Sequence, residues 1–198
     1  IAEGYFQNAE IPSNYYQFDT PANLNSCQDL YAMPHADPAW STHNNLLAFN
    51  ESRGFIWAAC HAVSVLEQVV NPLDPTENLI FLSNTGLIDF GDHDDGTPPY
   101  SYAHHNDPVM QLLGPVDGAT TNGSEQIFVP NGSGWRSTTR IAAFDPDHPD
   151  ILAGNSPGEA AVIAYGRGHG VSSNGYVMYE AGHSHAKGSG PDNVAAQR

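Results

Sequence analysis

The sequence predicts an α/β domain with a mainly parallel sheet flanked by helices, a C-terminal hairpin and long loops. Two passages predict this class. Five apolar residues stand in a row at 55–59, and apolar residues at helical spacing follow them directly. That order is typical of a strand buried on both faces and the helix after it. Near the end, two apolar runs at 160–165 and 176–179 are joined by a glycine-rich stretch, which predicts a hairpin.

The other elements follow from local patterns. A helix is predicted over 41–51, with Ser41 or Thr42 as N-cap and Gly54 as the glycine that ends it. A second helix is predicted over 61–70, and a short one over 107–113 with proline at its first position. Further short strands are predicted at 29–34, 79–82, 126–129 and 139–144.

The composition suits one packed domain. The chain has 198 residues, of which 40% are hydrophobic and 10% aromatic, so a core is expected rather than disorder. No apolar run approaches the roughly 20 residues of a membrane span, so no transmembrane segment is expected. We expect an extended aromatic arm over 1–27, the α/β domain over 28–186 and a flexible polar tail over 187–198.

The charge balance is strongly acidic and restricts the partners. There are 22 acidic residues against 6 basic ones, for a formal charge of -16. Such a surface repels phosphates, so no nucleic acid partner is expected, whereas cations and basic partners are favoured. The single lysine, Lys187, and the many small polar residues are typical of secreted, extracellular proteins. The chain opens without methionine or a signal peptide, which a removed leader or pro-segment would explain.

Cys60 is the sharpest candidate for chemistry because it lies between the buried strand and the helix. A thiol at a helix N-terminus loses its proton more readily and becomes a better nucleophile. Catalysis would also need a histidine base and an orienting carboxylate. Two other interpretations stay open: Cys60 is an inert buried thiol, or it forms a disulfide with Cys27.

Two passages resemble a known superfamily. Gly54-Phe-Ile-Trp-Ala-Ala-Cys60-His61-Ala62 resembles the nucleophile elbow of class I glutamine-amidotransferase-like proteins, and the Cys-His pair is most similar to their intracellular-protease and chaperone branch. The segments 160–168 and 175–183 resemble the closing hairpin of that superfamily. The resemblance implies a mainly parallel, flavodoxin-like sheet.

The resemblance also implies site residues and a partner. His183 or the adjacent His61 would be the base, with Glu180 as the orienting carboxylate. Two alanines, Ala59 and Ala62, stand where the tight turn of an elbow favours glycine. The family begins with two further strand–helix units, so we expect self-association, or a removed or companion chain that supplies the early part of the fold.

Two acidic loops are candidates for calcium. The first is rich in aspartate and glycine, and the second is a shorter turn. Their aspartates are Asp89, Asp92, Asp94 and Asp95 in the first loop, and Asp145, Asp147 and Asp150 in the second. A transition-metal site at His183 and His185, with His61 or Glu180 as third ligand, is a weaker hypothesis.

Two functions follow as hypotheses. The first is an extracellular structural or assembly protein, built on a glutamine-amidotransferase-like fold and stabilised by cations. The second is a cysteine-dependent hydrolase or amidotransferase-like enzyme that uses Cys60 with His183 or His61.

Overall fold

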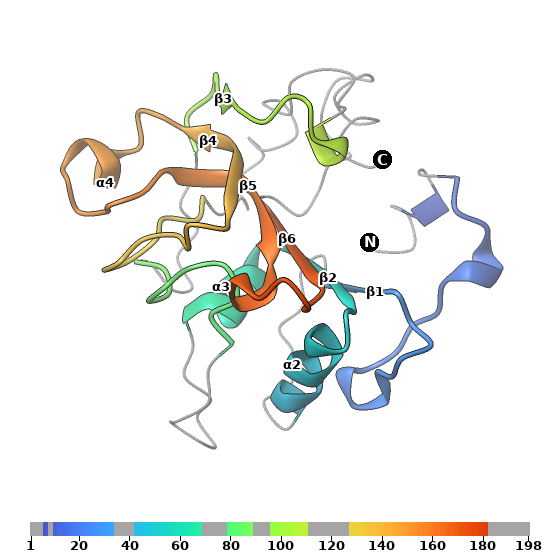
Figure 1. The fold of residues 1–198 in the computed structure, drawn as a ribbon. Helices are drawn as coiled ribbons and strands as arrows, with labels where there is room; N and C mark the ends of the chain where they lie inside the picture. The colour runs from blue at the N-terminus through green and yellow to red at the C-terminus, as the bar shows by residue number, and fades with distance from the viewer. Residues whose placement is uncertain are drawn as a thin grey trace.

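The sheet has six strands in the spatial order β1-β2-β6-β5-β4-β3 within the part of the chain that the structure describes (Figure 1). The structure is a computed structural model, and it describes residues 6–7, 10–33, 42–68, 79–88, 96–110 and 127–181. The strands are β1 Leu30–Met33, β2 Phe55–Ala59, β3 Ser101–Tyr102, β4 Arg140–Asp145, β5 Ala160–Arg167 and β6 Tyr176–Glu180.

The sheet is mixed, which corrects the expectation of a mainly parallel one. β1 and β6 both run parallel to β2, whereas β6–β5, β5–β4 and β4–β3 are antiparallel pairs. The last three described strands, β4, β5 and β6, follow one another through connections without a long crossover helix, and such neighbours pair antiparallel. The α/β class and the β5–β6 hairpin are confirmed.

The helices before and after β2 are confirmed with small shifts of their ends. They are α2 His43–Glu51 and α3 His61–Gln68; the short α4 Pro149–Leu152 lies between β4 and β5 (Figure 1). In α2, the buried side chains recur at helical spacing: His43, Leu46, Phe49 and Asn50. Single 3₁₀ turns stand at Ser13–Tyr15, Pro21–Asn23, Pro108–Met110 and Gly168–Gly170. None of the described helices is long and apolar enough to cross a bilayer.

Gly54 has a different role from the predicted cap. The left-handed residue after α2 is Arg53, with φ 76°, and the amide of Gly54 donates to the carbonyl of Phe49 at 2.9 Å. A Cβ on Gly54 would stand 2.3 Å from Cζ of Phe49. Gly54 is therefore required because the buried Phe49 ring packs directly against its backbone.

The strand predicted at 79–82 is not formed, and neither is one over 127–129, the described part of the run predicted at 126–129. Leu79, Phe81 and Leu82 are buried, but the backbone of this run is bound by side chains and by single backbone groups instead of by a neighbouring strand. Arg136 donates to the carbonyls of Ile80 at 2.9 Å and Phe81 at 3.2 Å. Within 127–129, Phe128 makes an isolated antiparallel bridge to Ala161. A buried apolar run outside a ladder has the same sequence pattern as a buried strand, which explains why both runs were predicted as strands.

Candidate functional site

Cys60 lies at the carboxyl edge of the parallel part of the sheet. It follows β2 directly, and the neighbouring β1 and β6 run in the same direction as β2. All three strands therefore end at the same edge. Open α/β sheets bind their ligands at this edge, beside the carboxyl ends of parallel strands.

The backbone of Cys60 is left-handed. Its φ is 53°, in the left-handed region, at the junction between β2 and α3. A residue with a Cβ adopts this region at a cost of about 1–2 kcal/mol, and such strain is concentrated at functional sites. The amide of Cys60 donates to the carbonyl of Glu180 at 3.3 Å, which holds this residue against the end of β6. The thiol is buried.

Glu180, the predicted orienting carboxylate, lies beside Cys60. It pairs in register with Ala59, the residue before Cys60, and its side chain is buried. Oε2 of Glu180 accepts a hydrogen bond from Nε1 of Trp57 at 3.2 Å. The structure therefore brings Glu180 to Cys60, and it adds Trp57 as a contact that the sequence analysis did not predict.

The two predicted histidine bases are not placed relative to Cys60. His61 is the first residue of α3, but its side chain lies outside what the structure describes. His183 lies outside the described residues, three positions beyond Glu180 in the sequence, and His185 lies outside them too. The chain between Glu180 and His183 can span at most roughly 10 Å, because three extended residues reach no farther.

The two cysteines are not joined by a disulfide in the structure. Cys27 is exposed and Cys60 is buried. Of the three interpretations of Cys60, the nucleophile and the inert buried thiol are compatible with this state.

The side chain of Glu67 on α3 is a buried carboxylate that was not predicted from the sequence. Oε1 of Glu67 accepts hydrogen bonds from the amide of Leu82 at 2.6 Å and from the hydroxyl of Tyr179 at 2.6 Å. Oε2 accepts from the amide of Ser83 at 3.0 Å and from the Ser83 hydroxyl. Burial raises the pKa of Glu67. Its place four residues after the buried Val63, on the inward face of the helix, was the available signal.

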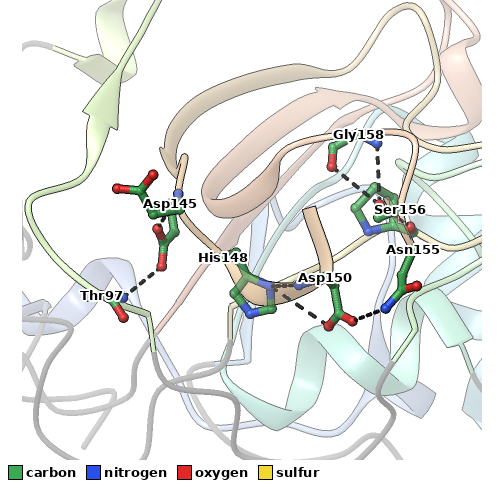
Figure 2. A network of polar contacts seen from close by, with 9 residues as sticks. Thr97, Asp145, His148, Asp150, Asn155, Ser156 and Gly158 are labelled. Atoms are coloured by element: carbon green, nitrogen blue, oxygen red, sulfur yellow. Dashed lines mark hydrogen bonds and ion pairs between the residues drawn. The ribbon is translucent and has the colours of Figure 1, made fainter. Parts of the chain in front are cut away.

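The second acidic turn is a hydrogen-bonded loop. Figure 2 shows the carboxylate of Asp145 accepting the amide of Thr97 at 2.8 Å, and its Oδ1 also accepts the amide of Asp147 at 3.0 Å. Asp150 accepts from Asn155 at 2.9 Å and faces Nδ1 of His148 at 3.8 Å. These carboxylates accept hydrogen bonds from their own turn and from the backbone of Thr97.

The calcium hypothesis rests mainly on the four aspartates of the first acidic loop. Asp89, Asp92, Asp94 and Asp95 lie outside the described residues. Within the described ranges, no three His, Cys, Asp or Glu side chains are grouped so that they could hold a metal ion.

Comparison of the chain with protein-family models, with curated proteins and with solved structures found no match in any of the three.

Proposed function

We propose that this chain is a cysteine-dependent hydrolase or amidotransferase-like enzyme with Cys60 as its nucleophile. The observation that carries the proposal is the left-handed Cys60, with φ 53°, at the junction of β2 and α3. The position of Cys60 at the carboxyl edge of parallel strands and the neighbouring Glu180 support it. The resemblance to class I glutamine-amidotransferase-like proteins supplies the same assignment from the sequence.

The proposed reaction is acyl transfer through a thioester. The sulfur of Cys60 attacks a carbonyl carbon, and its proton passes to His183 or His61. Amides in the first turn of α3 stabilise the oxyanion, as they do in other elbows. The leaving amine or alcohol takes the proton from the histidine, and water then cleaves the thioester and restores the thiol. Glu180, held by Trp57, orients the histidine.

Thiol alkylation across pH tests the nucleophile. In a Cys27→Ser variant, Cys60 is the remaining cysteine, and iodoacetamide incorporation is followed by intact mass. We expect alkylation of the native protein with an inflection below the roughly 8.5 of an ordinary cysteine. The matched control is Cys60→Ser, in which Cys27 reports an exposed thiol. Alkylation of Cys60 solely after denaturation would contradict the proposal.

The two histidines are separated by the same assay. His183→Gln and His61→Gln are made in the Cys27→Ser background. The variant that lacks the base should lose the low inflection, while the other keeps it. A panel of small esters and amides then screens for turnover that Cys60→Ser abolishes.

A second candidate function is the extracellular structural or assembly unit, which exposed aromatic residues on the N-terminal arm favour. Tyr15 is 77% exposed and Phe18 is 75% exposed, far more than aromatic side chains of a core. Analytical ultracentrifugation tests it: Phe18→Ser should lower the mass of an assembled species. Leu152→Ser, which removes an apolar side chain that is 70% exposed on α4, is the control and should leave it unchanged. A wild-type monomer at all concentrations would exclude self-assembly.

The calcium and secretion proposals have their own tests. Calcium bound by the first acidic loop should raise the melting temperature of the protein, and replacement of Asp92 and Asp94 by Asn should remove that increase. Recovery of the protein from the medium of the cells that make it would support secretion.

A further inference from the structure

A groove lies at the opposite edge of the sheet from Cys60. It is lined by the first residues of β2 and β6, Phe55 and Tyr176, by Tyr165 and Arg167 of β5, and by Arg140 of β4 with Asp107. Its volume is about 840 Å³, within the range of roughly 300–1,000 Å³ of small-molecule sites. Phe55 is the first residue of β2 and Cys60 follows its last residue, so the length of β2 lies between the start of the groove and the thiol.

One wall of the groove is an aromatic platform. The rings of Phe55 and Tyr176 are stacked, with centroids 5.5 Å apart and planes 18° apart. Phe55 is 44% exposed, so part of its ring remains open to a ligand. A flat ring gains contact area and favourable offset stacking on such a surface.

The guanidinium of Arg167 stands beside this platform. Its Cζ lies 4.0 Å from the centroid of the Tyr176 ring, and Nη1 donates to the carbonyl of Asn174 at 2.7 Å. These two contacts fix the side chain and use one of its five N–H donors. Among the described residues, no carboxylate pairs with Arg167, so its charge is available to an anion.

The carboxylate in the groove is already neutralised. Oδ2 of Asp107 binds Nη1 of Arg140 at 2.7 Å and also accepts the hydroxyl of Tyr165. The hydrogen bond from Tyr165 lowers the pKa of Asp107, and Arg140 lowers it further. The groove thus contains two of the chain's six basic residues and one paired acid, in a protein of formal charge -16.

We propose that this groove binds a small organic anion that carries a carboxylate on a flat ring. The ring packs on Phe55 and Tyr176, and the carboxylate binds the guanidinium of Arg167. Such a bidentate pair is charge-assisted and directional, which explains why arginine rather than lysine stands at this position. The proposal does not depend on Cys60 chemistry.

The test uses 4-hydroxybenzoate as the probe, with binding followed by saturation-transfer NMR and isothermal titration. The matched neutral ligand is 4-hydroxybenzamide, which has the same ring without the charge. We expect the benzoate to bind saturably and the benzamide at least about tenfold more weakly, because a charge-assisted hydrogen bond is about twice as strong as one between neutral groups. Equal binding of the two ligands, or no saturable binding of the benzoate, would overturn the proposal.

Variants locate the binding. Arg167→Met keeps most of the aliphatic stem and should weaken benzoate binding about tenfold, whereas Arg53→Met removes an exposed arginine outside the groove and should not. If Arg167→Met fails to fold by circular dichroism, Arg167→Lys and Phe55→Ala decide the question. The first should weaken binding of the benzoate, and the second should weaken binding of both ligands. Equal losses in Arg53→Met and the groove variants would refute the site.

Discussion

The hydroxyl of Tyr179 on β6 donates a 2.6 Å hydrogen bond to Oε1 of Glu67 on α3, and both side chains are fully buried. Tyr179 precedes Glu180, and α3 follows Cys60 directly. This bond therefore fixes the helix that begins at the proposed nucleophile against the strand that carries its proposed orienting carboxylate.

Replacement of Glu67 by Gln should destabilise the fold. The amide group cannot accept hydrogen bonds at its nitrogen, so at least one of the donors from Leu82, Ser83 and Tyr179 loses its acceptor in the interior. An unsatisfied buried donor costs about 1–3 kcal/mol. Urea denaturation measures the free energy of unfolding, and Glu51→Gln on exposed α2 surface is the control, expected within about 0.5 kcal/mol of wild type. Equal stability of the two variants would show that the network contributes little.

The raised pKa of Glu67 should make stability depend on pH. Burial raises this pKa above its ordinary value of 4.5, so the folded protein keeps a proton that the unfolded chain has lost. The contribution of Glu67 to the free energy of unfolding is complete below pH 4.5. It declines by up to about 1.4 kcal/mol per pH unit as pH rises toward the pKa of Glu67 in the folded protein. The difference in unfolding free energy between wild type and Glu67→Gln should decrease over this window. An increase with pH would reverse the assignment.

The left-handed backbone of Cys60 predicts an unusual preference for glycine. Cys60→Gly and Cys60→Ala both remove the thiol, but glycine relieves a left-handed cost of about 1–2 kcal/mol, while losing Cβ burial of about 0.8 kcal/mol. Thermal unfolding should therefore show Cys60→Gly at least as stable as Cys60→Ala. Ala62→Gly, inside α3, is the control and should cost about 1 kcal/mol. A clearly more stable alanine at position 60 would argue against the left-handed backbone.

The start of β6 should not tolerate any side chain at Gly175. A Cβ there would stand 1.9 Å from the carbonyl oxygen of Gly54, and the amide of Gly175 donates to the carbonyl of Asn50 at 2.7 Å. Gly175→Ala must move backbone and should cost about 3 kcal/mol or more. In Gly154→Ala, nothing lies within 4 Å and the left-handed φ of 75° is the single penalty, about 1–2 kcal/mol. Similar melting temperatures for both variants would contradict the close approach.

The predictable part of the site is the part that is local in sequence. The apolar run Phe55–Ala59 followed by helical spacing placed Cys60 between a strand and a helix, and the structure agrees. The contact of Trp57 with Glu180 joins positions 123 residues apart, and the Glu67–Tyr179 bond joins positions 112 residues apart. No local pattern records such pairs.

By itself, the sequence determined the α/β class, the helices around β2, the closing hairpin and an acidic surface, because these depend on the spacing of residues along the chain. Tertiary structure alone decided that the sheet is mixed, that the apolar run at 79–82 is held by Arg136 and Glu67 instead of a ladder, and that Arg140 and Arg167 share a groove. The physical reason is that packing between distant segments selects strand partners and buried polar contacts. The free energy of burial and the cost of an unsatisfied buried polar group are larger than the local preference of a residue for helix or strand.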